Sequence, residues 1–237
     1  MLNVTALAGF GIGRSAPAGP AISSIGTATS SSGATVSIAV GAAGVPAGST
    51  IILFAYEAAS ALGGTAADSA GNAYTSIGQG FLGGAVNQGY GIAKLFYKYN
   101  AAALVNGDSI TFTKKSSGDM AAITAMCVTG VLSASDPLDA SVTISFYTDG
   151  TGSYPSYTSN APSMAGEMFV ALMAEYLNYF TQDTVHGWTA PPVAAFSNGQ
   201  VCGGSKINIG TGALTYEPTI DGTDGLTRAW IIGLKPA

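Results

Sequence analysis

Residues 50–56, TIILFAY, decide the fold of this chain. The run is apolar throughout and begins with β-branched residues, which is typical of a central strand buried on both faces. Residues 36–40, VSIAV, alternate between large and small side chains, which is the two-residue period of a strand with one buried face. Together the two stretches predict a β-sheet.

Segments of the same kind continue to the end of the chain, each of them short and bounded by Gly, Asn, Asp, Ser or Pro. They cover residues 73–80, 89–100, 108–115, 120–131, 141–148, 167–177, 201–210, 212–220 and 227–237. The turns between them draw on 33 glycines and 10 prolines. This pattern predicts an all-β protein, a β-sandwich of jelly-roll type.

Two segments permit a helix. Residues 100–107, NAAALVNG, could form one helical turn, and residues 166–180, GEMFVALMAEYLNYF, contain good helix formers. For the second segment we predict a strand, because a central sandwich strand also reads as an unbroken apolar run.

The chain contains no repeat of fixed period and no long internal linker, so residues 21–237 are expected to form one β-sandwich domain. Residues 1–20 are interpreted as an extended N-terminal arm and not as a signal peptide, because no basic residue precedes their apolar stretch. The arm is expected to dock on a neighbouring subunit, with strand-like backbone pairing. Its apolar anchors are Leu2, Val4, Leu7, Phe10 and Ile12.

Charged residues make up only 9% of the chain, against roughly 25% in an ordinary soluble domain. Such a surface is either kept soluble by hydroxyl and amide groups or covered by neighbours in an assembly, and we favour the assembly. The net charge of −5 and the absence of any basic cluster beyond Lys114 and Lys115 argue against nucleic acid as a partner. No run approaches the roughly 20 apolar residues that membrane insertion needs.

The residues that could support catalysis are few. His186, the single histidine, is predicted to be a turn residue stacked near Trp188. Glu57 and Glu167 lie beside apolar strands and could converge as a glycosidase pair, whose carboxyl groups must be roughly 5–10 Å apart. We expect no enzyme activity and no cofactor.

The two cysteines are too few for a disulfide framework. Cys127 lies in an apolar run and is expected to be a small buried hydrophobe, the alternative being a single Cys127–Cys202 bridge.

Three acidic, glycine-containing stretches are interpreted as turns: DSAGNAYTS at 68–76, TDGTG at 148–152 and DGTDG at 221–225. In the first, Asp68 is expected to accept a backbone hydrogen bond from two residues on, and Gly71 and Asn72 both tolerate positive φ. A surface cation at Asp221 and Asp224 is the alternative for the third stretch.

Tyrosines cluster in two places and could form either a subunit interface or a platform on which sugars stack. We favour the interface. The residues are Tyr147, Tyr154, Tyr157, Tyr176 and Tyr179.

Several segments occur in an order that resembles the order in a known domain. TIILFAYEA is followed by DSAGNAYT, KLFYKYNAAA, NGDSITFT, AMCVTGV with PLD seven residues later, AGEMFVAL, GWT and RAWIIGLK. Over about residues 21–237 this series resembles a β-sandwich domain that recurs in tailed-bacteriophage virion proteins and in some bacterial surface proteins. The resemblance implies a structural or host-contacting role and supplies no catalytic residues.

We therefore expect a non-enzymatic virion structural protein: a capsid decoration, a head spike or a fibre-base or tail-associated subunit. It would assemble in the host cytoplasm, be exposed on the particle, contact other virion proteins and form a homo-oligomer, a trimer by analogy. The alternatives are a carbohydrate-binding adhesin that recognises a host surface glycan and a depolymerase that cleaves one.

Overall fold

The computed structural model describes residues 19–59, 61–82, 91–139, 143–148, 156–176, 179–181, 183, 185–189, 194–196, 199–207, 210–221 and 226–237. Within these ranges every regular element is a β-strand, and every pairing between strands is antiparallel. The all-β prediction is confirmed. No helix that could span a membrane is found among the described residues.

The described residues form 17 β-strands. They are β1 (Ala21–Ser30), β2 (Thr35–Ala39), β3 (Thr50–Glu57), β4 (Thr65–Asp68), β5 (Thr75–Phe81), β6 (Ile92–Lys98), β7 (Ser109–Thr113), β8 (Ala121–Thr129), β9 (Thr143–Thr148), β10 (Tyr157–Thr158), β11 (Met168–Tyr176), β12 (Tyr179–Thr181), β13 (Ala194–Phe196), β14 (Gly199–Ile207), β15 (Thr215–Tyr216), β16 (Thr219–Asp221) and β17 (Leu226–Leu234).

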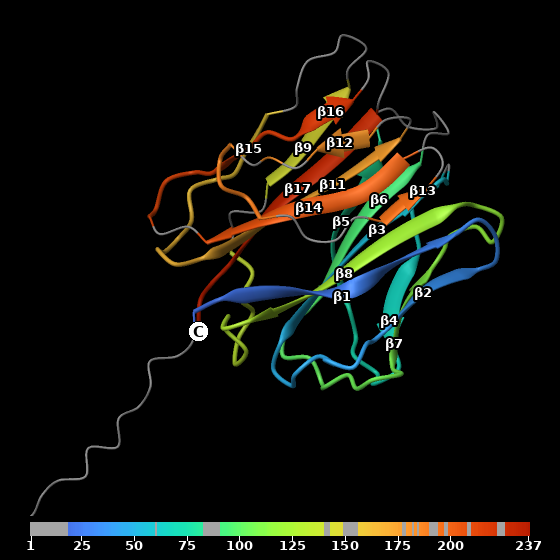
Figure 1. Ribbon diagram of the computed structural model, residues 1–237, viewed down its shortest axis with the longest axis horizontal. Helices are drawn as coiled ribbons and strands as arrows, with labels where there is room; N and C mark the ends of the chain where they lie inside the picture. The colour runs from blue at the N-terminus through green and yellow to red at the C-terminus, as the bar shows by residue number, and fades with distance from the viewer. Residues whose placement is uncertain are drawn as a thin grey trace, which may run out of the picture.

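Three sheets are stacked in layers (Figure 1). The central sheet has the order β1-β8-β3-β6-β5. The second sheet, β2-β7-β4, covers one of its faces, and the third sheet, β13-β14-β11-β17-β9, covers the other. Two short pairs, β10-β15 and β12-β16, complete the described strands.

Strand β3 explains why there are three layers. All eight of its residues are buried, as the run at 50–56 predicts. Ile52, Phe54 and Tyr56 belong to the core shared with the third sheet. Ile51 and Leu53 point the other way, into the core shared with the second sheet. A strand that is apolar at every position needs a layer on each side, because successive side chains point to opposite faces.

The first eight strands are rolled up as a jelly roll. Their antiparallel pairs β1·β8, β2·β7 and β3·β6 are nested one inside the next, as in a long hairpin folded over itself. The roll departs from the regular pattern at β5, which pairs with β6 at the edge of the central sheet and not with β4. The sandwich prediction is confirmed, and the third sheet extends it by one layer.

Neither of the two segments that permit a helix forms one among the described residues. Residues 168–176 form β11, which lies between β14 and β17, so the strand prediction there is confirmed. Residues 100–107 form no helical turn, because Leu104 is buried and bridges to Val45.

Candidate functional site

A polar cluster lies on the outer face of the third sheet. A small core there, which includes Phe169, Met173, Trp188 and Tyr216, covers the side of β11 and β17 that faces away from the central sheet. The Trp188 ring packs edge-on against Tyr216 with centroids 5.1 Å apart, and its Nε1 donates to the carbonyl of Thr215 over 2.8 Å. The turn at residues 185–187 sits above this core and carries His186, so the turn prediction is confirmed.

Asp183 organises the cluster. Its buried carboxylate accepts the backbone N–H of His186 at 3.0 Å, the backbone N–H of Glu217 at 2.7 Å and His186 Nδ1 at 2.9 Å. Burial alone would raise the pKa of Asp183, but these hydrogen bonds and the nearby imidazole outweigh it and hold the pKa below its ordinary value. Asp183 is therefore ionised at neutral pH and can accept all three of these hydrogen bonds.

The cluster does not form a nucleophilic triad. His186 Nε2 faces Glu217 Oε2 at 4.0 Å, and the hydroxyl of Ser156 donates to the other oxygen of Glu217 at 2.7 Å. A serine nucleophile must instead donate to the imidazole. Lys206 Nζ donates to the carbonyl of His186 at 2.6 Å. The arrangement ties four segments of the chain together across the sheet.

Sequence reasoning found only His186 of this cluster. The Asp183-x-x-His186 spacing is a usable local signal, because a carboxylate three residues before a turn can accept from both the backbone and the ring. Lys206 and Glu217 are distant in sequence and carry no such signal. Among the described residues, no group of three or more His, Cys, Asp or Glu side chains is placed to hold a metal ion.

The proposed carboxylate pair is wrong, because Glu57 and Glu167 do not converge. Glu57 ends β3, whereas Gly166, next to Glu167, lies beside Pro236. Pro236 bridges to Val131, just beyond the end of β8 that pairs with the start of β3 at Thr50. Seven residues of extended strand separate the two ends of β3, which is about 23 Å. That distance is too large for a glycosidase pair.

Glu167 is instead a buried carboxylate beneath an exposed loop at residues 163–165. Its Oε1 accepts the hydroxyl of Ser163 and the backbone N–H of Met164, both at 3.0 Å. Its Oε2 is buried and has no hydrogen-bond partner in the described structure. Burial raises the pKa of Glu167, and the neighbouring carboxylate of Asp139 raises it further. The hydrogen bonds from Ser163 and Met164 lower the pKa but do not cancel the increase.

This environment predicts that Glu167→Gln stabilises the protein by about 1 kcal/mol at neutral pH. The amide keeps the acceptor oxygen, removes a buried charge and can donate to Asp139. In the folded protein the pKa of Glu167 lies above its ordinary value of 4.5. The free energy of unfolding of the wild type therefore falls as the pH rises from 4.5 to the folded pKa. The advantage of the variant should therefore be absent at about pH 4 and present at pH 7, in urea unfolding curves. Asp119→Asn, at a half-buried acid, is the control and should change stability by less than about 0.5 kcal/mol at either pH. An equal gain at both pH values contradicts this account.

The turn at residues 68–76 is explained by its own hydrogen bonds. Asp68 Oδ1 accepts the backbone N–H of Asn72 at 2.9 Å, and Oδ2 accepts the Asn72 amide at 2.8 Å and the Tyr74 hydroxyl at 3.0 Å. Gly71 has a φ of 77°, as predicted. One detail differs, because the backbone N–H that Asp68 accepts comes from four residues on. Turn chemistry accounts for this stretch.

Cys127 is a free thiol buried in the core between the central and second sheets, as predicted, so the Cys127–Cys202 bridge is not formed.

Several predicted site residues fall outside the described residues. These are the arm anchors Leu2, Val4, Leu7, Phe10 and Ile12, together with Tyr154, Asp224 and most of the turn at 148–152. For Tyr147, Tyr157, Tyr176 and Tyr179 the structure describes the strand positions only. Tyr147 lies opposite Thr227 and Tyr176 opposite Leu226, so β17 brings these two positions to one end of the third sheet. Tyr157 is elsewhere, paired with Tyr216, and Tyr179 pairs with Asp221.

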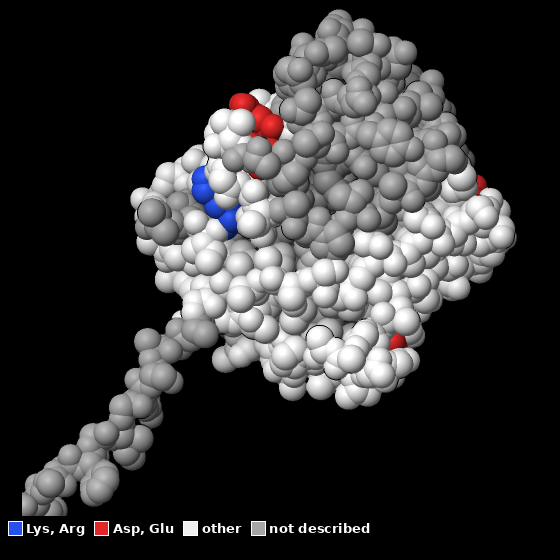
Figure 2. Space-filling view, in the orientation of Figure 1, with Lys and Arg blue, Asp and Glu red and all other residues white. Residues whose placement is uncertain are grey.

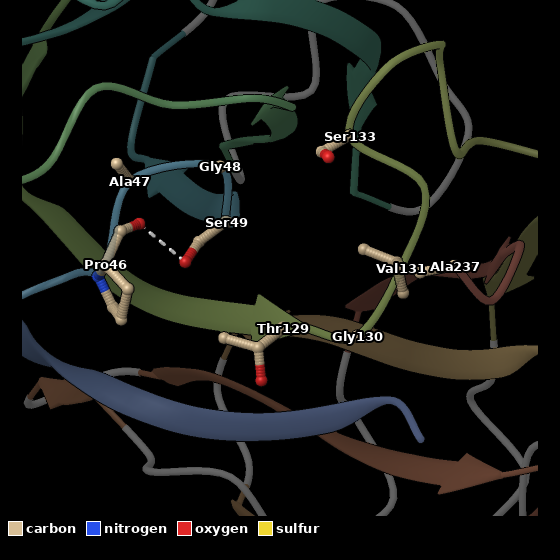
Figure 3. A pocket seen from close by; sticks show the side chains of 9 residues that line it. All are labelled: Pro46, Ala47, Gly48, Ser49, Thr129, Gly130, Val131, Ser133 and Ala237. Atoms are coloured by element: carbon tan, nitrogen blue, oxygen red, sulfur yellow. Dashed lines mark hydrogen bonds between the residues drawn. The ribbon is translucent and has the colours of Figure 1, made fainter. Parts of the chain in front are cut away.

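One hollow opens beside the end of β8 (Figure 3). It measures about 270 Å³, slightly below the range of ordinary ligand pockets. It is lined by Pro46, Ala47, Gly48, Ser49, Thr129, Gly130, Val131, Ser133 and Ala237. None of these side chains is charged, and the Ser49 hydroxyl donates to the carbonyl of Pro46 at 2.7 Å. The hollow offers little to orient a polar substrate.

The part of the surface that the structure describes carries few largely exposed charges. Eight described charged residues are buried: Glu57, Lys94, Lys114, Asp139, Glu167, Glu175, Asp183 and Arg228. Only Lys115, Asp136 and Glu217 are largely exposed among the described residues. On the face shown in Figure 2, nearly all described atoms belong to uncharged residues. Such a surface can be covered by a neighbouring protein without the cost of desolvating charges.

Comparison with known proteins adds no family: no protein-family model, curated protein or solved structure matches the chain. Fold and surface together define the class as a three-layer β-sandwich built on a jelly roll, with few largely exposed charges among its described residues.

Proposed function

We propose that this chain is a non-enzymatic structural subunit of a phage-like particle, as a capsid decoration, a spike or a fibre-base protein exposed on the particle. The observation that carries the proposal is the small number of largely exposed charges among the described residues, which are Lys115, Asp136 and Glu217. A free soluble domain of this size normally exposes roughly a quarter to a third charged residues, whereas the centre of a protein interface is depleted in them.

The architecture supports the same role. Jelly rolls are common in viral capsids and in lectins, where the loops and the outer faces of a rigid sandwich make the contacts. Here both faces of the central sheet are used for packing, so the outer sheets, the loops and the strand edges remain for partners. These outer sheets, loops and strand edges could form the contacts of a homo-oligomer within a larger particle.

The test is density-gradient sedimentation of a lysate of the cells that produce the protein together with its particles. On a density gradient, the chain should migrate with assembled particles and remain there at moderate salt, because the contacts rely little on charge. Recovery of the whole chain at the top of the gradient, away from any particle, contradicts the proposal.

A carbohydrate-binding adhesin is the second candidate. It rests on the tyrosines that cluster in the sequence at 147–157 and 176–179, because aromatic rings can stack on the faces of sugars. Specific binding in a glycan screen, lost in Tyr154→Ala or Tyr157→Ala, supports it. A spike that also binds a glycan satisfies both candidates.

A further inference from the structure

Strand β1 leaves one edge of the central sheet open. Its ten residues, AISSIGTATS, pair only with β8, and none of them is buried. No other described residue makes a backbone hydrogen bond to it. The outward N–H and C=O groups therefore form a row that can accept another strand.

This edge lacks most of the features that usually protect an edge strand. β1 contains no charged residue and no proline, and its one irregularity is a bulge between Ser24 and Gly26. The other edge strands of the three stacked sheets are shorter: β5 has 7 residues, β9 has 6, β2 has 5, β4 has 4 and β13 has 3. Long edges without charge or proline can recruit strands from other chains.

The sequence contains a segment that suits this edge. At every even position from 2 to 12 stands an apolar residue: Leu2, Val4, Ala6, Ala8, Phe10 and Ile12. The odd positions from 3 to 11 carry Asn, Thr or Gly, apart from Leu7. Residues 2–12 thus have the two-residue period of a strand with one apolar face, no charge and about the length of β1.

The connection between this segment and β1 favours a second copy over the same chain. Residues 13–20, GRSAPAGP, contain two prolines. A proline restricts the residue before it to extended conformations, which here applies to Ala16 and Gly19. Residues 2–12 could lie on their own β1 only if this connection reversed the chain, and the restriction at these two positions disfavours such a reversal.

We propose that residues 2–12 of one copy add as a strand to the outer edge of β1 of a second copy. This inference rests on the proposed assembly role and names the contact that builds it. Main-chain hydrogen bonds supply the affinity. The apolar face of the added strand covers Ile25 and Ala28, which are half-buried where the core between the central and second sheets reaches this edge.

Disulfide trapping between two full-length chains tests the contact. With the apolar face over Ile25 and Ala28, the odd residues of the arm share a face with the exposed Thr27. One chain carries Asn3→Cys, Thr5→Cys or Gly9→Cys, which sample three registers, and the other carries Thr27→Cys. The control is Thr65→Cys on β4, which is exposed on an edge strand of the second sheet. The unsubstituted chain reports any background from the native cysteines.

We expect a crosslinked dimer with Thr27→Cys, lost with Thr65→Cys, and a disulfide-linked peptide that joins the arm to β1. In the unsubstituted full chain, hydrogen exchange of β1 amides should slow as protein concentration rises. The inference is overturned by equal crosslinking at both positions, by no crosslink in any register, or by an intramolecular link in a doubly substituted chain at high dilution. If the chain still sediments with particles in any of these cases, only the arm contact is wrong and the proposed function stands.

Discussion

Lys94→Ala should lower the free energy of unfolding by about 3–5 kcal/mol, which is the typical cost of removing one partner of a buried ion pair. The measurement is urea unfolding followed by circular dichroism at neutral pH. Lys94 and Glu57 are both fully buried. They are diagonal neighbours on one face of the central sheet, since Lys94 lies opposite Ala55 and Glu57 opposite Ile92.

The cost is large because Glu57 remains buried after its cation has gone. Its Oε2 accepts from Lys94 Nζ, while its Oε1 accepts the backbone N–H of Lys115 at 2.6 Å and of Ser116 at 3.0 Å. Lys94 also lies over the Phe112 ring, 4.9 Å from its centroid. Burial lowers the pKa of Lys94, and the contact with Glu57 opposes that shift.

Two controls separate the ion pair from simple loss of side-chain packing. Lys98→Ala, on the same strand at a half-buried position, should cost no more than about 1 kcal/mol. The double variant Lys94→Met with Glu57→Gln should recover most of the loss, because the glutamine keeps the acceptor for Lys115 and Ser116 and no charge stays buried. A double variant as unstable as Lys94→Ala contradicts this explanation.

The sequence predicts the fold better than the site because strand signals are local. The uninterrupted run at 50–56 is sufficient to predict a strand buried on both faces, and a strand at 168–176 follows from the same rule. The third layer is not predictable in this way. It depends on the odd residues of β3 packing on one sheet and the even residues on another, which requires knowing which distant strands pair.

The partners of charged residues inside apolar strands are harder to predict from the sequence. The pairing of Lys94 with Glu57 has a signal, since each interrupts an apolar run with an opposite charge, but their diagonal register appears only once β3 and β6 are paired. Glu57 and Glu167 each lie beside an apolar run in the sequence, yet they lie near opposite ends of β3 in the stacked sheets. Local pattern identifies buried carboxylates, and only topology identifies their partners.

Trp230→Ala should be the most damaging single substitution in the core between the central and third sheets, with a loss of about 3–5 kcal/mol in the free energy of unfolding. The Trp230 ring is fully buried and meets Phe54 of β3 edge-on, with centroids 5.5 Å apart. Arg228 lies 5.1 Å from its centroid on the same strand. Truncation leaves a cavity at the contact between the two sheets.

Because this core is shared, the damage should reach both sheets. We expect hydrogen exchange to become faster in β3 as well as in β11, and the unfolding transition to remain single. Trp188→Phe is the matched control: its ring lies on the outer face of the third sheet, and loss of its hydrogen bond to Thr215 should cost about 1 kcal/mol without affecting β3. Faster exchange confined to β11 in the Trp230→Ala protein would mean that the third sheet unfolds as an independent unit. The central and second sheets would then form the stable core, with the third sheet attached to it only through this one packed face.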